Sequence, residues 1–353
     1  MNSQTESPQP EEKSSIAVGI IGAGRIGKLH AENIIRHIPQ ISLKAIADIN
    51  LDTSWVNTLP VAVTGDEVQC IFNDPAIDAV LICSPAPSHP SLIIQAAQAG
   101  KHIFCEKPIA LDITAIQQAL AAVEQAQVIL QVGFNRRFDP NFAKVKRVVQ
   151  AGGIGELHII HITSRDPEPP PHDYIASSGG IFLDMSIHDF DMARFLAGSE
   201  ITEVYATGAA LIDPTLTQLG DVDTAVIQLS FANGALGVID NSRQAVYGYD
   251  QRVEVFGSQG KMLAQNVSAT QTELSTADAV TREKPMAFFL DRYQASYVAE
   301  LRSFCHAIRH KQAPAVDGRD GLIAVIVGHA AKQSCQNHQP IRINYEHPEQ
   351  HGI

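Results

Sequence analysis

The sequence is short of cysteine, of basic residues and of long apolar runs. Its five cysteines form no C-x-x-C pair, which argues against a zinc site or a disulfide framework and favours reduced thiols in a cytoplasmic protein. No apolar stretch has the length of a transmembrane helix, so we expect no membrane insertion. The 26 Lys and Arg are outnumbered by 38 Asp and Glu, which gives a net charge of −12. Such a chain is not expected to bind nucleic acid or an anionic membrane surface.

The histidines show no metal-binding pattern. The sequence contains no H-E-x-x-H motif. His158 and His161 are three positions apart on a predicted strand, where their side chains point to opposite faces. We therefore expect no bound metal.

The length and the order of apolar segments predict two domains. A chain of 353 residues is too long for one comfortable core. Residues 1–15 are polar, lack the apolar core of a signal peptide and are expected to form a disordered tail. Residues 16–135 alternate apolar strands with helices, which predicts an α/β domain with a doubly wound parallel sheet of the Rossmann type. Residues 136–345 form the second predicted domain.

The second domain is expected to be of the α+β class. Alternating strands flank Asn233-Gly234 and Ser258-Gln259, and each pair predicts a tight two-residue hairpin turn. Apolar segments near the end of the chain have helical spacing. We expect a largely antiparallel open sheet with helices on one face.

A glycine-rich loop follows the first strand. Gly22, Gly24 and Gly27 form G-x-G-x-x-G between a strand and a helix, which is the context of a dinucleotide-binding loop. Gly22 permits a tight turn, Gly24 lets the backbone approach a pyrophosphate, and Gly27 allows close helix–strand packing. Arg25 and Ile26 begin the helix whose free N–H groups would hold the phosphates.

Asp48 ends the second predicted strand, at the spacing expected for an acid that binds the ribose. A carboxylate there accepts hydrogen bonds from the ribose hydroxyls and repels a 2′-phosphate. The neighbouring residues supply no arginine that could receive such a phosphate. The sequence therefore predicts NAD rather than NADP.

Two further segments carry candidate catalytic side chains. Glu106-Lys107-Pro108 stands at the carboxyl end of a predicted parallel strand, where ligands collect and a lysine could bond a substrate hydroxyl. The apolar segment 179–195 contains Asp184 and His188 four residues apart, so one continuous helix would present both on the same face.

In combination and in order, the glycine loop, "SPAPSH", "CEKPIAL" and "GGIFLDMSIHDFDMARF" resemble the Gfo/Idh/MocA oxidoreductases, and the inositol 2-dehydrogenase branch in particular. The resemblance implies that His188 is the base that removes the hydroxyl proton of a secondary alcohol. It implies that Lys107 holds the reacting hydroxyl and that Asp184 binds the adjacent one. It also implies cofactor contacts from Ser84, Pro85, His89, Glu106 and Lys107.

Other polar residues are candidates for contact with a polyol. Tyr247 matches a substrate-contacting tyrosine of the inositol branch, and four more candidates are Asn135, Arg136, Arg165 and Asp166. For each of them a salt bridge at the surface or between the domains is an equal alternative. Ser164-Arg165-Asp166 departs from the histidine and asparagine found near this position in inositol dehydrogenases, which leaves the identity of the polyol open.

The resemblance implies NAD-dependent oxidation of a cyclic polyol, foremost myo-inositol to 2-keto-myo-inositol. The alternatives are scyllo-inositol, an aldose or another sugar derivative, and a regulator that senses NAD(P) without turnover. The complete set of Lys107, Asp184 and His188 favours chemistry. The resemblance further implies a second domain for substrate and subunit contacts, and a cytoplasmic homotetramer.

Overall fold

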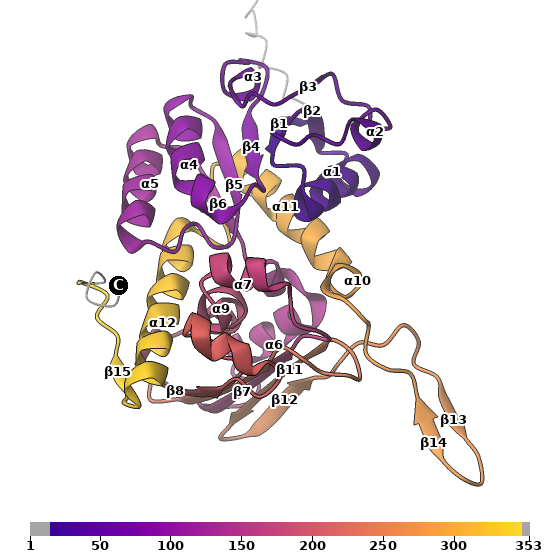
Figure 1. The fold of residues 1–353 in the computed structure, drawn as a ribbon, viewed down its shortest axis with the longest axis vertical. Helices are drawn as coiled ribbons and strands as arrows, with labels where there is room; N and C mark the ends of the chain where they lie inside the picture. The colour runs from indigo at the N-terminus through magenta and orange to yellow at the C-terminus, as the bar shows by residue number, and fades with distance from the viewer. Residues whose placement is uncertain (1–14, 348–353) are drawn as a thin grey trace, which may run out of the picture.

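The computed structural model describes residues 15–347, so the predicted disordered tail lies outside the described residues except for Ser15. The chain forms a six-stranded sheet, a seven-stranded sheet and a two-stranded arm that projects away from the rest (Figure 1). The predicted fold class, a Rossmann sheet followed by a largely antiparallel sheet, is confirmed.

The first sheet is parallel throughout and has the strand order β3-β2-β1-β4-β5-β6. Its strands β1, β4 and β6 are buried along their whole length, as continuous apolar runs predict for strands covered on both faces. The order reverses between β1 and β4, and such a switch point is where open α/β sheets bind ligands. The bounds are β1 (Ile16–Ile21), β2 (Ile41–Ala47), β3 (Val63–Gly65), β4 (Ala79–Ile82), β5 (His102–Glu106) and β6 (Leu130–Gly133).

The crossover helices of this sheet follow local sequence signals. The carboxylate of Asp112 accepts a hydrogen bond from the N–H of Ala115 and caps α5, and Gly100 closes the turn after α4 with φ +70°. The elements are α1 (Arg25–His37), α2 (Thr53–Val56), α3 (Gln69–Phe72), the short 3₁₀ helix η1 (Ala86–Ser88), α4 (His89–Gln98) and α5 (Ile113–Ala126).

The second sheet has the order β12-β11-β7-β10-β9-β8-β15. Among the described strands, β7 and β10 pair in parallel and the other neighbours pair antiparallel. Buried and exposed residues alternate along β9, as expected for a sheet with one covered face. The bounds are β7 (Leu157–Arg165), β8 (Ile201–Ala209), β9 (Thr224–Phe231), β10 (Leu236–Ser242), β11 (Asp250–Gly257), β12 (Gly260–Ala264) and β15 (Ile341–Arg342).

Helices lie between the second sheet and the Rossmann domain (Figure 1). The longest is α12, which begins with a capping box formed by Asp317 and Asp320. The helices of the second half of the chain, some of which lie in this layer, are η2 (Asn135–Phe138), α6 (Pro140–Gln150), α7 (His172–Ser178), α8 (Ile181–Asp184), α9 (Ser186–Ala197), η3 (Pro214–Leu219), α10 (Phe289–Arg292), α11 (Gln294–His310) and α12 (Gly318–Asn337). The projecting arm consists of β13 (Glu273–Ser275) and β14 (Val280–Arg282).

One of the two predicted hairpin turns is wrong. Ser258 and Gln259 do join β11 to β12 in a two-residue turn, because Gly257 pairs with Gly260. At Asn233-Gly234 the N–H of Phe231 donates to the carbonyl oxygen of Ala235, so the loop is longer than two residues. Gly234 takes φ +86°, which fits the left-handed position of a three-residue hairpin loop.

Helix α11 belongs by sequence to the second half but packs on the Rossmann sheet. Its Val298, Leu301 and Phe304 share one hydrophobic cluster with Val18 and Ile20 of β1. The predicted boundary between residues 135 and 136 falls inside η2, shortly after β6, and stays a prediction. The two sheets are thus held together by packed helices as well as by the chain crossing at η2.

Candidate active site

The glycine loop has the geometry that a dinucleotide needs. Gly22 has φ +93°, and a Cβ there would lie 2.4 Å from the backbone nitrogen of Ser84. A Cβ on Gly27 would lie 1.9 Å from the carbonyl oxygen of Gly22. Gly24, by contrast, faces open space, with no atom within 4 Å of the Cβ position. The first and third glycines are therefore required by packing, and the middle one leaves a backbone surface free for a ligand.

The start of α1 has free hydrogen-bond donors. Gly24 caps the helix without a side-chain hydrogen bond, and the first turn contains no acidic residue. Backbone N–H groups at such an end have no intrahelical partner and attract phosphate. Arg25 is exposed at this end and lies over the ring of Phe288, with 5.5 Å between its guanidinium carbon and the ring centroid. These residues fit the pyrophosphate of NAD.

Asp48 lies directly beside the glycine loop. Its carboxylate accepts hydrogen bonds from the N–H of Ala23 at 2.5 Å and of Asn50 at 2.7 Å. The side chain is thereby fixed at the carboxyl end of β2, next to the strand at which the order reverses. The position and the charge fit a ribose diol.

The loops after β4 and β5 are tied together by His89. Its Nδ1 lies 2.8 Å from the carbonyl oxygen of Pro108, and its Nε2 lies 2.7 Å from that of Ser84. Ser84 Oγ also bonds Ser88 Oγ at 2.6 Å, and Pro85 precedes η1. Contacts of these residues with the cofactor stay a prediction.

Lys107 and Asp184 meet across the two halves of the molecule. The Lys107–Pro108 peptide bond is cis. The Nζ atom of Lys107 donates to the carbonyl oxygen of Asp184 at 2.8 Å and to its Oδ1 at 3.3 Å. The lysine therefore links the end of β5 to the segment that carries His188.

The segment around His188 is not the continuous helix that the sequence predicted. Helix α8 ends at Asp184 and α9 begins at Ser186, with Met185 between them. The N–H of His188 donates to the carbonyl oxygen of Met185 at 3.3 Å. The spacing of i and i+4 therefore does not by itself place Asp184 and His188 on one helix face. The Asp184 carboxylate forms its hydrogen bonds with Lys107, Tyr174 and Arg243, not with His188.

His188 lies in an apolar and positively charged setting. Its ring packs edge-on against Phe134, with 5.9 Å between the ring centroids, and no described residue forms a hydrogen bond with its Nδ1. Burial lowers the pKa of His188 well below its usual value, and the charges of Lys107 and Arg136 lower the pKa further. His188 is therefore neutral in the folded protein, which is the form that can accept a proton.

Arg243 and Tyr174 complete the surroundings of Asp184, and no sequence motif marks either of them. Arg243 Nη1 donates to Asp184 Oδ2 at 3.1 Å, and the Tyr174 hydroxyl donates to Asp184 Oδ1 at 2.8 Å. Burial favours the neutral acid, but Lys107 and Arg243 outweigh it, so the pKa of Asp184 is lowered. Asp184 is thus a buried carboxylate between two cations.

Near this cluster, Arg136 and Asn135 are buried and Asp166 is half-buried. Burial raises the pKa of Asp166 to about 6, against the opposing charge of Arg243. Arg136 Nη1 donates to Asp189 Oδ1 at 2.6 Å. Asn135 Nδ2 donates to Ser296 Oγ at 3.3 Å. Their contact with substrate stays a prediction.

Arg165 and Tyr247 have different partners from this cluster. Arg165 forms a two-pronged ion pair with Asp240 and donates to the Tyr247 hydroxyl at 3.1 Å. The Tyr247 hydroxyl donates to Asp250 Oδ2 at 2.5 Å. Adjacent strand residues point to opposite faces, so Arg165 lies on the face opposite to the buried Ser164. Their predicted role in substrate binding stays a prediction.

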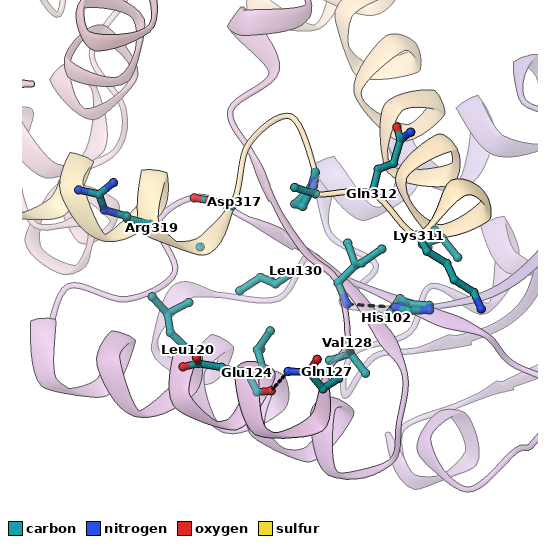
Figure 2. A pocket seen from close by; sticks show the side chains of 16 residues that line it. His102, Leu120, Glu124, Gln127, Val128, Leu130, Lys311, Gln312, Asp317 and Arg319 are labelled. Carbon is teal, nitrogen blue, oxygen red and sulfur yellow. Dashed lines mark hydrogen bonds between the residues drawn. The ribbon is translucent and has the colours of Figure 1, made fainter. Parts of the chain in front are cut away.

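A cavity of about 920 Å³ lies at the amino-terminal ends of strands β5 and β6 of the first sheet (Figure 2). It is lined by His102 and Leu130, which begin β5 and β6, together with Lys311 and Asp317. Parallel sheets of this kind bind ligands at the carboxyl ends of their strands. The cavity is therefore separate from the candidate active site.

The fold and the site together define a two-domain nucleotide-dependent oxidoreductase architecture. Residues 16–134 match the sequence profile of the oxidoreductase family with an NAD-binding Rossmann fold, and residues 142–263 match the GFO/IDH/MocA C-terminal domain. The chain belongs to the GFO/IDH/MocA oxidoreductase family, as the sequence resemblance predicted.

Named relatives span nearly the whole chain. An uncharacterized oxidoreductase of Bacillus subtilis, YrbE, is 54% identical and aligns over 94% of this chain and 97% of its own. Myo-inositol 2-dehydrogenase of Thermotoga maritima is 48% identical, over 92% and 98%. The crystal structure of scyllo-inositol dehydrogenase from Lactobacillus casei with bound NAD(H) and scyllo-inositol has a TM-score of 0.85 and 30% identity, over 93% and 99%.

Proposed function

We propose that this protein oxidises a secondary alcohol of a cyclic polyol with NAD, and that its main reaction converts myo-inositol to 2-keto-myo-inositol. The observation that carries the proposal is the contact of Lys107 with Asp184 beside a neutral His188, at the carboxyl edge of a nucleotide-binding sheet. The 48% identity to a myo-inositol 2-dehydrogenase supports the choice of substrate.

The proton of the reacting hydroxyl goes to His188. Bound NAD accepts the hydride, so the protein has to position the alcohol and remove its proton. A neutral imidazole is a suitable base for this step.

Lys107 and Asp184 orient the polyol. The ammonium group of Lys107 bonds the reacting hydroxyl and stabilises the negative charge that develops on its oxygen. Asp184 accepts a hydrogen bond from the adjacent hydroxyl. Arg243 has two buried donors, Nε and Nη2, that find no acceptor in the described part of the chain. A ligand with many hydroxyl oxygens would satisfy these donors better than an apolar alcohol.

The cofactor residues fit NAD. Gly24 leaves the backbone open to a pyrophosphate, and α1 presents free N–H groups. The carboxylate of Asp48 suits ribose hydroxyls and repels a 2′-phosphate.

We also propose that the protein is a cytoplasmic homotetramer that uses the uncovered face of the second sheet. This face exposes Val226, Leu236, Phe256 and Leu263, and apolar groups of this size favour burial against another subunit. No helix in the described part of the chain combines the length and the apolar character that crossing a membrane requires.

The test is NADH formation from a panel of inositols and aldoses. We expect turnover with NAD and myo-inositol to exceed turnover with scyllo-inositol and with glucose. A preference for scyllo-inositol would favour the reaction named for the L. casei relative. Binding of NAD without turnover on any member of the panel would contradict an enzymatic function and favour a cofactor sensor.

A further inference from the structure

One histidine and two glutamates form a group that includes the residue before Lys107; His30 and Glu300 are buried and Glu106 is half-buried. His30, Glu106 and Glu300 place one nitrogen and two carboxylate oxygens within 4.8 Å of one another. His30 comes from α1, Glu106 ends β5, and Glu300 comes from α11. The group therefore joins the cofactor helix, the turn of Lys107 and the helix that returns from the second half.

Glu106 is held tightly on two sides. His30 Nε2 lies 2.8 Å from Glu106 Oε1 and donates to it, because a carboxylate can only accept. On the other side the Glu106 carboxylate packs over Gly133, where a Cβ would lie 3.0 Å from Oε2. Glu106 directly precedes Lys107, so its position sets the start of the lysine's turn.

Glu300 has no visible partner for its charge. Its side chain is fully buried, and neither carboxylate oxygen accepts a hydrogen bond among the described residues. The titratable groups that face it are Glu106, His30, the Tyr297 phenol and the Cys83 thiol. The carboxylates of Glu106 and Glu300 have oxygens within 4.8 Å of each other. If both were ionised they would repel each other strongly in this poorly solvated site, so one of them has to be neutral.

We propose that Glu300 carries a proton in the folded enzyme and shares it with Glu106. Glu106 is then held between His30 and Glu300, and its fixed position orients the neighbouring Lys107 toward the cofactor. Burial and the charge of Glu106 both act in this direction, since they raise the pKa of Glu300 well above its usual value. Glu300 is thus a positioning residue, and its effect on catalysis rests on the proposed dehydrogenase function.

The protonated state is tested by infrared spectroscopy on the full-length protein, labelled with ¹³C at the glutamate side-chain carboxyl. At about pH 8 an ordinary glutamate is ionised. We expect the carbonyl band of a neutral glutamic acid, its loss in Glu300→Gln, and its retention in Glu124→Gln, which changes an exposed residue of α5. Absence of the band in the wild type would overturn the inference.

Kinetics test the positioning role. Glutamine can donate to Glu106 as a protonated acid does, so Glu300→Gln should keep kcat within about threefold. Glu300→Leu cannot donate and should lower kcat about tenfold or more while the Kd for NAD stays unchanged. Equal loss in both variants would contradict the shared proton.

Metal analysis distinguishes the protonated Glu300 from the alternative that the three residues bind a metal ion. A divalent ion present in stoichiometric amount in the wild type and lost in Glu300→Gln would overturn the proposal in favour of a metal site. An inactive wild type that still shows the neutral-acid band would contradict the proposed reaction and leave the protonated Glu300 in place.

Discussion

Lys107 Nζ lies 2.8 Å from the carbonyl oxygen of Asp184 and 3.3 Å from its Oδ1, although 77 positions separate the two residues. The contact joins the end of a Rossmann strand to the second half of the chain. It holds a cation and an anion next to a neutral imidazole, which is the combination that alcohol oxidation needs.

Replacement of His188 by alanine should remove most of the turnover. Loss of a general base typically costs about 10² to 10⁴ in kcat. Gly24 and Asp48, which we propose to bind NAD, are unaffected, so the Kd for NAD measured by fluorescence titration should be nearly unchanged. Near-normal kcat in His188→Ala would rule out its role as base.

The pH dependence of activity should also show that His188 acts as a neutral base. The pKa of His188 is lowered in the folded protein, so the neutral form predominates above a pKa that lies below the ordinary value of about 6.5. Activity should fall as the pH drops through that lowered pKa. An acid limb of kcat/KM above about pH 7.5 would contradict a buried neutral base.

Replacement of Lys107 by alanine should lower kcat and raise KM together. The variant loses the group that we propose to bond the reacting hydroxyl, and it leaves Asp184 with one cation fewer. We expect a loss of about 100-fold or more in kcat/KM. Lys144→Ala, which changes an exposed lysine of α6, is the matched control. A loss of thermal stability with intact kcat would instead indicate a structural role.

Asp48 should determine the choice of cofactor. Asp48→Ala removes the charge that repels a 2′-phosphate, so the ratio of kcat/KM for NADP to that for NAD should rise about 10-fold or more. Steady-state kinetics with both cofactors measure this ratio. Asp66→Ala removes a nearby exposed charge and should leave it unchanged. A wild type that prefers NADP would refute the assignment.

The ionised side chain of Asp166 should lower the free energy of unfolding at neutral pH. Its pKa is raised from 3.8 to about 6, so between these values the folded state binds more protons than the unfolded state and stability falls as the pH rises. Asp166→Asn should therefore raise the free energy of unfolding by about 1 to 3 kcal/mol at about pH 7.5 and by less at about pH 5. Denaturant titration at both pH values checks this, and a gain independent of pH would contradict the buried charge.

The glycine loop and Lys107 could be located from sequence because their constraints are local. The positive φ of Gly22 and the contact of Gly27 with Gly22 arise within the strand–turn–helix unit itself, and Lys107 follows directly from the end of β5. The break at Met185 could not be located in this way, because the apolar pattern of that segment suits one helix as well as two.

Arg243 was missed because its role depends on tertiary structure. It follows β10, whose parallel register with β7 is set by the whole second sheet, and no motif marks it. For Arg165, the alternation of strand residues already places it on the face opposite to Ser164, which is a signal that the sequence does contain.

Helix α11 can complete the packing of the Rossmann sheet only after most of the chain has been synthesised. Val298, Leu301 and Phe304 cover apolar residues of β1, yet they belong to α11, which is synthesised long after β1 and after every other strand of the first sheet. A nascent chain ending near residue 135 would leave that side of the Rossmann sheet uncovered and prone to association. The nucleotide-binding half is therefore expected to become fully packed only late in translation, and residues 16–135 expressed alone should be poorly soluble.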